Sequence, residues 1–312
     1  MIKKSFLWFY RVAFDLLGFF IVAFLSATIA IQYYFLPHFD DYKGRITEKI
    51  SQTLGQKVTI GEIQAKWNGL NPHLSISNMD IYDKENRIAL SLKQVEASLS
   101  WTSIPMLEPR LASLGIYQPE LTIRREADGV VYVAGISMSG PNETEFPNWL
   151  LRQASVNVVD ANIIWQDELR HAPELALNHL NLQLENPAWD SLRGRHQFSL
   201  KATPSTGASK PIDIRGNILG KDLSRLEKWH GTVYAKIEDT DLAAWRRWLD
   251  YPSLLQEGHG SAQLWVSFAD SQVEAFTSDL SLENVFTQLP YKGPIAGEES
   301  RFNKIAGRIQ WQ

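Results

Sequence analysis

Residues 58–67 read VTIGEIQAKW, and their pattern predicts the fold. Their apolar side chains alternate with polar ones, change phase at Gly61, and then alternate again. A period of two predicts a strand with one apolar face, and a phase change at glycine is typical of a β-bulge. The apolar positions of this predicted bulged strand are Val58, Ile60, Ile63, Ala65 and Trp67.

The same pattern returns later in the chain. Residues 156–165 read VNVVDANIIW and align with residues 58–67 without a gap, with Val159 in place of Gly61. The repeated apolar positions are Val156, Val158, Ala161, Ile163 and Trp165. The strands that follow also align, with Leu74, Ile76, Met79 and Ile81 matching Leu175, Leu177, Leu180 and Leu182. A repeated hairpin unit of this kind predicts an extended, stacked architecture.

Further alternating segments extend this prediction. They lie at residues 88–92, 95–101, 121–123, 131–133, 198–202, 212–218, 232–237, 263–268 and 273–282, with a hairpin turn at 127–129. Short helices are predicted at 147–153, 223–229 and 241–249. The predicted fold class is mainly β: an N-terminal transmembrane helix followed by an extended, curved, antiparallel and groove-forming sheet of repeated strand and hairpin units, with a few short helices.

An uncharged apolar run at residues 16–36 predicts a transmembrane signal-anchor helix at residues 12–37. About 20 apolar residues are needed to cross a bilayer. A buried helix of a soluble protein and a cleaved signal peptide are the alternatives, but the run is longer than a typical signal-peptide core. The expected membrane-anchor residues are Leu16, Phe19, Phe20, Ile21, Val22, Phe24, Leu25, Ile29 and Ile31.

The charges around this run predict its orientation. Lys3, Lys4 and Arg11 precede it, so residues 1–11 are expected in the cytoplasm and the body outside it. Residues 38–56 are predicted to form an amphipathic helix, capped by Asp40 or Asp41 and ended by Gly55. Residues 57–312 would then be a periplasmic repetitive β-sheet region. An alternating strand only begins at 308–312, so the chain is expected to be truncated at its C-terminal end.

Composition and motifs narrow the possible chemistry. The 312 residues carry a net charge of −4, which gives no reason to expect nucleic-acid binding, and they include no cysteine. No HExxH, GxSxG, P-loop or GxGxxG motif is present. The prediction is therefore no enzyme, no cofactor and no metal. An enzyme would need an acid–base or metal cluster assembled from distant residues.

The one-sided strands leave two interpretations open. Their apolar face is either a filled core or, if it stays uncovered, a trough suited to acyl chains. Sequence cannot say which phase of each strand faces the groove, because a one-residue slip inverts the faces. The lipid-groove candidates are Val58, Ile60, Ile63, Ala65, Trp67, Leu74, Ile76, Leu90, Leu92, Val156, Val158, Ile163, Trp165, Leu175 and Leu177.

Three segments carry a resemblance to a known family. They read GQKVTIGEIQAKWNGLNPHLSISNMDIYD (55–83), ASLSWTSIPMLEPRLASLGIYQPELTIRREADGVVYV (97–133) and VDANIIWQDELRHAPELALNHLNLQLEN (159–186). In this order, and after an apolar anchor, they resemble AsmA-like proteins, most closely the YhdP-type members of Gram-negative bacteria. Full members of that type are several times longer than this chain.

The resemblance implies a function as well as a fold. It implies an inner-membrane-anchored, bridge-like lipid-transfer protein whose long β-sheet rises through the periplasm. It also implies phospholipid transport toward the outer membrane and a part in outer-membrane integrity. The expected partners are the membrane crossed by a single helix, phospholipid acyl chains, and periplasmic or outer-membrane proteins. The alternative is a structural or assembly factor for outer-membrane protein biogenesis that carries no lipid.

Overall fold

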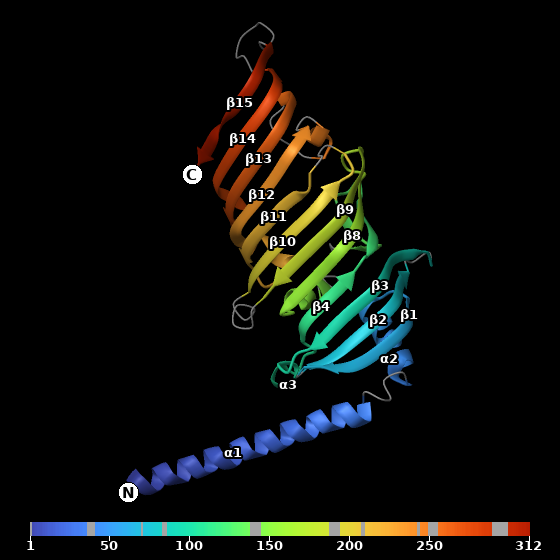
Figure 1. Ribbon diagram of the computed structural model, residues 1–312, viewed down its shortest axis with the longest axis vertical. Coiled ribbons are helices and arrows are strands. Elements are labelled where there is room, and N and C mark those ends of the chain that lie inside the picture. Colours follow the sequence, from blue (N-terminus) through green and yellow to red (C-terminus); the bar gives the residue numbers. More distant parts are fainter. Residues whose placement is uncertain are drawn as a thin grey trace.

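The computed structural model places a long N-terminal helix beside the base of a large twisted sheet (Figure 1). The structure describes residues 2–35, 41–69, 71–82, 86–137, 145–186, 194–206, 210–241, 244–248, 255–288 and 299–312. The helical segments are α1 (Ile2–Ala30), the π-helical η1 (Ile31–Phe35), α2 (Lys43–Leu54), α3 (Ser103–Met106), α4 (Glu145–Leu151), and the 3₁₀ turns η3 (Leu223–Lys228) and η4 (Ala244–Arg247).

Fifteen strands form one hydrogen-bonded sheet, which confirms the mainly β fold class. They are β1 (Val58–Asn68), β2 (Asn71–Tyr82), β3 (Ile88–Leu99), β4 (Leu111–Tyr117), β5 (Glu120–Arg125), β6 (Val131–Val133), β7 (Ile136–Ser137), β8 (Ser155–Asp167), β9 (Ala172–Glu185), β10 (Arg195–Pro204), β11 (Ile212–Leu219), β12 (His230–Asp241), β13 (Leu255–Ala269), β14 (Gln272–Gln288) and β15 (Glu299–Trp311). From β8 to β15 each strand pairs antiparallel with its neighbour in sequence.

One joint departs from the predicted antiparallel sheet. β4 and β5 follow one another along the same side of β8, and both run parallel to it. Between them Gln118 takes a left-handed φ of 49°, and its backbone N–H donates to the carbonyl of Val159. The sheet is therefore mixed, because the chain crosses from β5 to β8 through β6, β7 and α4 rather than through a hairpin.

The phase change predicted at Gly61 is present, but it involves both strands of the hairpin. The pairing register runs unchanged past it, with Ile60 opposite Met79 and Glu62 opposite Ser77. Gly61 faces Asn78, which has a left-handed φ of 55°. A Cβ atom on Gly61 would lie only 2.9 Å from the Ser77 carbonyl oxygen, so the close approach of the strands requires glycine.

Four helix predictions need correction at their ends. Helix α2 begins after Tyr42, with no side-chain cap, so Asp41 does not cap it, and Asp40 lies outside the described residues. Gly55 ends α2 in the left-handed conformation, as expected. The segment predicted at 147–153 starts earlier, as α4. The segment predicted at 223–229 forms a 3₁₀ turn. Within the segment predicted at 241–249, the described residues Ala244–Arg247 form another, and β12 continues through Asp241.

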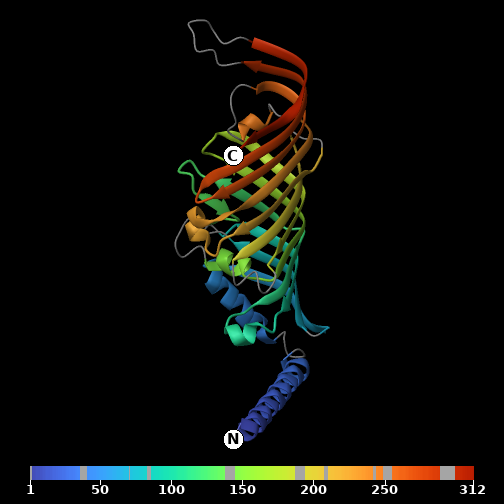
Figure 2. The ribbon, with the colours of Figure 1, turned by 90° about the vertical axis from the view of Figure 1, so that its left-hand side faces the viewer.

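Helices cover part of the apolar face of the sheet. Ile46 and Ile50 of α2, with Trp149 and Leu150 of α4, pack against the buried cluster of the first strands. Further along, Trp245 and Trp248 at η4 pack with Leu175 and other residues of the middle strands. Figure 2 shows that the sheet is bent and that these helices lie on one side of it.

Candidate functional site

The strand register assembles an unbroken row of side chains across twelve strands. Each member lies directly opposite the next on the neighbouring strand, from β1 at the base to β15. We call this the first apolar row. Its members are Ile63, Ile76, Val95, Ile116, Val158, Leu182, Leu200, Ile214, Ala235, Leu264, Ser278 and Ile309.

A second apolar row runs beside the first, two residues along each strand and on the same face. No member carries a polar side chain. It consists of Ala65, Leu74, Ala97, Leu114, Val156, Leu184, Phe198, Gly216, Val233, Val266, Phe276 and Trp311. The ring of Phe198 lies over Gly216, where a Cβ atom would come within 2.3 Å of it. Glycine therefore leaves room in this row for the aromatic ring.

The row between these two points to the opposite face and is mostly polar. It consists of Gln64, Ser75, Glu96, Gly115, Asn157, Gln183, Ser199, Arg215, Tyr234, Trp265, Thr277 and Gln310. Trp265, which is out of phase with the apolar residues Leu264 and Val266 of the same strand, packs here against Tyr234 with 5.2 Å between ring centroids. The sheet thus has one apolar and one polar face along its whole series of strands.

Ion pairs lie within and between the strands on this polar face. The guanidinium of Arg215 donates hydrogen bonds of 2.9 and 2.7 Å to Asp213 and holds the pKa of that carboxyl below its ordinary value. Arg308 of β15 does the same for Asp279 of β14, with two hydrogen bonds of 2.6 Å that lower the pKa of Asp279. Charge is therefore compensated on this face, and both pairs remain partly in water.

The predicted groove residues all lie on strands of the base and middle of the sheet. Six belong to the two rows: Ile63, Ile76, Val158, Ala65, Leu74 and Val156. Val58, Leu90, Ile163 and Leu177 are linked through Ile81 and Leu121 into a shorter row. Met79 joins Ile60 to Leu92, Trp165 lies opposite Leu175, and Trp67 lies opposite Pro72.

The base of this face is closed by the protein itself. Val156 is 2% exposed and Ile63 is 3% exposed, under the cover of α2 and α4. In the middle of the sheet Leu182, Leu184 and Leu200 are only half-buried. A bound apolar chain could reach the base only by displacing α2 or α4, whereas Leu182, Leu184 and Leu200 keep part of their surface exposed in the described structure.

The strand segments of β10 to β14 were predicted, but their contribution to the apolar face was not. The strand expected to begin at residue 308 is the last part of β15, which begins at Glu299. The alternation within residues 198–202, 212–218 and 263–268 identifies each strand without relating one strand to the next. Only the register brings Leu200 opposite Ile214. Ser278 was also missed, since a buried serine in an apolar row has no sequence signal. Its side chain is 2% exposed, and its Oγ atom has no hydrogen-bond partner among the described residues.

The strand predicted at residues 95–101 is wrong at its C-terminal end, where Trp101 lies. It was expected on the apolar phase of a strand, but β3 ends at Leu99 and Trp101 lies in the turn before α3. Its ring centroid is 4.6 Å from that of Phe24 in α1 and 6.3 Å from that of Trp67. The tryptophan therefore links the base of the sheet to the N-terminal helix.

The N-terminal helix is long and apolar enough to cross a membrane. Residues Phe14–Tyr34 have a mean hydropathy of 2.2, and this span is not buried against the sheet. The predicted anchor residues with described side chains are exposed: Leu16, Phe19, Phe20, Ile21, Val22, Phe24, Leu25 and Ile29. The side chain of Ile31 lies outside the described part of the structure. Among the residues that the structure describes, no group of three His, Asp or Glu side chains could hold a metal ion.

The chain thus combines an apolar N-terminal helix with a long sheet that has one apolar and one polar face. A family model described as YhdP protein matches residues 1–312. The chain belongs to the YhdP family. Comparisons with curated proteins and with solved structures gave no match. Membership of the YhdP family is consistent with a role related to lipid transport and with anchoring in the inner membrane, and the YhdP family is not a known enzyme family.

Proposed function

We propose that this chain takes part in phospholipid transport between the inner and outer membranes, and thereby in outer-membrane integrity. Acyl chains would move passively along the two apolar rows and would enter the covered base by displacing α2 or α4. α1 would anchor the chain in the inner membrane, with its N-terminus in the cytoplasm and residues 57–312 in the periplasm. The observation that carries the proposal is the continuity of the rows from β1 to β15.

The rows suit an apolar ligand whose binding does not depend on directional contacts such as hydrogen bonds. Burial of hydrocarbon is favourable by about 25 cal/mol per Å² and needs no specific geometry. An acyl chain that moves from Leu182 to Leu200 exchanges one aliphatic contact for a similar one, so no deep minimum would hold it. Its headgroup would stay in water beyond the edge of the face. No residue in this scheme performs chemistry.

The half-buried middle of the sheet is the place to test the proposal. A photo-crosslinking amino acid at Leu200 would contact a lipid on the apolar face, whereas the same probe at Ser199 would face the opposite side. In cells grown with radiolabelled phosphate, we expect labelled phospholipid attached to the Leu200 probe and far less attached to the Ser199 probe. Equal labelling at both positions, or none at Leu200, would reject lipid conduction.

A pair of substitutions tests the function itself. Leu182→Asp places a charge in the first apolar row, and Gln183→Asp places the same charge on the polar face. We expect the first variant to abolish lipid crosslinking at Leu200 and to weaken the outer-membrane barrier against detergents, and the second to behave like the parent chain. Loss of the barrier with lipid crosslinking intact, together with crosslinks from the polar face to outer-membrane proteins, would favour the assembly-factor alternative.

A further inference from the structure

The turn that joins β3 to β4 is apolar and exposed at the end of the sheet nearest α1 (Figure 1). We call residues 99–107, LSWTSIPML, the basal tip; none of them is charged. Its large apolar side chains project into solvent: Leu99 is 45% exposed, Ile104 62%, Met106 45% and Leu107 95%. Burial within the protein therefore does not account for these four side chains.

The basal tip is nevertheless firmly held. The backbone N–H of Ser100 donates to the carbonyl of Arg110 over 2.8 Å. The hydroxyl of Ser103 donates to the same carbonyl over 3.0 Å and accepts from the Arg110 backbone N–H over 2.9 Å. These bonds close the turn across its neck, so the exposed side chains are displayed by an ordered loop.

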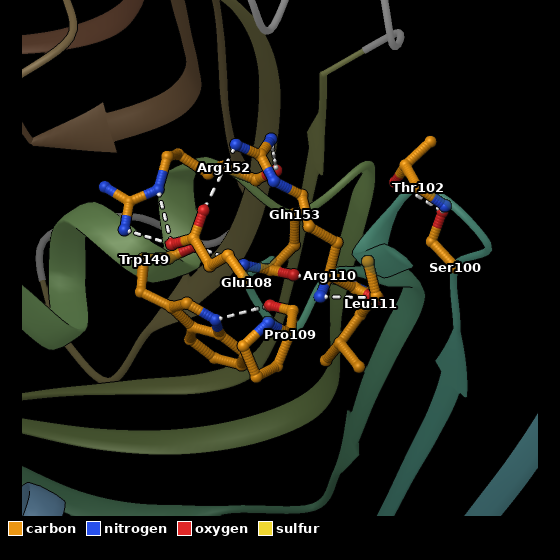
Figure 3. A network of polar contacts seen from close by, with 10 residues as sticks. Ser100, Thr102, Glu108, Pro109, Arg110, Leu111, Trp149, Arg152 and Gln153 are labelled. Carbon is orange, nitrogen blue, oxygen red and sulfur yellow. Dashed lines mark hydrogen bonds and ion pairs between the residues drawn. The ribbon is translucent and has the colours of Figure 1, made fainter. Parts of the chain in front are cut away.

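Charged groups lie behind the tip instead of within it (Figure 3). Glu108 accepts hydrogen bonds of 3.1 and 2.6 Å from Arg152, and it also pairs with Arg110 at 3.3 Å. The indole N–H of Trp149 donates to the Pro109 carbonyl over 2.8 Å. An uncharged apolar tip next to charged side chains and the indole of Trp149 is the distribution expected at a membrane interface.

The backbone at Leu107 supports the same interpretation. Leu107 ends α3 with a left-handed φ of 51°, a conformation that L-residues with a Cβ atom disfavour. Glycine is the usual choice for such a helix end, as Gly55 is for α2. Here the position carries a leucine that is almost wholly exposed. A large apolar side chain at a strained, exposed position points to a contact outside the protein.

The partner is indicated by the contact between the tip and α1. Trp101 of the tip packs on Phe24 of α1, within the apolar span Phe14–Tyr34. Phe24 lies ten residues before Tyr34, which is roughly 15 Å along a helix. For this contact to exist while α1 spans a bilayer, either the tip enters the membrane or α1 is tilted toward it. In both arrangements the tip contacts the same membrane interior as α1.

We propose that the basal tip inserts Ile104, Met106 and Leu107 into the lipid leaflet on the body's side of the membrane that α1 spans. The sheet is then held at two points, by a spanning helix and by an inserted loop. Glu108 and Arg152 would lie at the level of the headgroups. This inference requires α1 to span the membrane, but it does not depend on lipid conduction along the apolar rows.

The absence of native cysteine allows a direct test on the full chain. Leu107→Cys carries an environment-sensitive fluorophore after reconstitution into vesicles of phosphatidylethanolamine and phosphatidylglycerol. We expect emission at shorter wavelength and strong quenching by lipids that carry a spin label in their acyl chains. The matched control is Ser271→Cys in the exposed β13–β14 turn, which lies on strands remote from α1. It should show neither effect.

A second variant separates insertion from mere proximity to α1. Ile104→Asp combined with Met106→Asp makes the tip polar while the hydrogen bonds at its neck remain, so the fold should be kept. The fluorophore at Leu107 should then shift back toward the emission seen at Ser271. Emission and quenching at Leu107 that already match Ser271 in the parent chain would overturn the proposal. So would a Leu107 signal that is unchanged by the two aspartates.

Discussion

The side-chain carbonyl of Gln153 accepts a 2.7 Å hydrogen bond from the backbone N–H of Leu111. Gln153 follows α4 and is fully buried, and Leu111 is the first residue of β4 (Figure 3). The amide N–H₂ of Gln153 also donates to the Trp149 carbonyl in α4. One side chain thus fastens the covering helix α4 to the edge of the apolar face.

Replacing Gln153 should therefore loosen α4. Gln153→Ala leaves the buried N–H of Leu111 without a partner, and we expect it to lower the free energy of unfolding by about 1–3 kcal/mol. Chemical denaturation of the chain in detergent measures the change. Gln183→Ala, on the exposed polar face, is the control and should change stability by less than about 0.5 kcal/mol. Equal effects of the two substitutions would contradict this role for Gln153.

The ion pair of Arg125 with Asp167 predicts a loss of stability in acid. Burial raises the pKa of Asp167, but hydrogen bonds from Arg125 and from the Arg170 backbone outweigh burial, so the pKa lies below its usual value. A carboxyl with a lowered folded-state pKa stabilises the fold above its unfolded pKa of about 3.9, and this contribution is lost as the pH falls through the folded pKa.

Asp167→Asn should accordingly destabilise the chain at neutral pH by about 2 kcal/mol, less than a fully buried pair because Arg125 is partly exposed. The difference from the parent chain should shrink as denaturation is repeated below about pH 4. Glu120→Gln, which removes an exposed pair with Lys93, should have almost no effect at either pH. A pH-independent difference for Asp167→Asn would refute the assignment.

Gly260 is predicted to be intolerant of any side chain. A Cβ atom there would lie 2.0 Å from the backbone carbonyl oxygen of Ser281 on β14, and a backbone atom cannot swing aside. We expect Gly260→Ala to cost about 1–3 kcal/mol of stability by forcing β13 and β14 apart. Gly307→Ala on β15 meets nothing within 4 Å and serves as the control. Comparable losses in thermal unfolding would show that the two strands do not approach as closely as described.

Ser278 offers a substitution that should stabilise the chain. Its buried hydroxyl lies in the first apolar row between Leu264 and Ile309 without a hydrogen-bond partner among the described residues. Removing an unsatisfied buried polar group is favourable, so Ser278→Ala should raise the free energy of unfolding by about 1 kcal/mol. Ser199→Ala on the polar face should leave it nearly unchanged. A loss of stability in Ser278→Ala would mean that the hydroxyl has a bound water or another partner.

Sequence predicted the elements of this fold better than their arrangement. The alternation of Val58 and Ile60, and its repeat at Val156 and Val158, is a local property of each strand, and β1 and β8 are both present. The parallel joint between β5 and β8 was not predicted, because it depends on a crossover and not on the composition of either strand.

For the candidate face, too, sequence predicted individual strands better than their arrangement. The fifteen groove residues were chosen strand by strand, and the register brings members of this set opposite one another, as with Ile63 and Ile76 or Trp165 and Leu175. That they line a lipid path remains a prediction. The amphipathic pattern of residues 38–56 is consistent with Ile46 and Ile50 covering the first strands, but sequence did not indicate that Trp149 would join them, because the packing of a helix on a sheet depends on contacts between distant segments.

The order of the strands has a consequence for how the chain folds. From β8 onward each strand pairs with the one made just before it, so most backbone contacts have a low contact order. A strand made after β8 therefore finds its partner already in place. The exception is β8 itself, which must wait for the crossover before it can join β4 and β5. Assembly of the sheet is therefore expected to be vectorial, with its slowest step at that parallel joint.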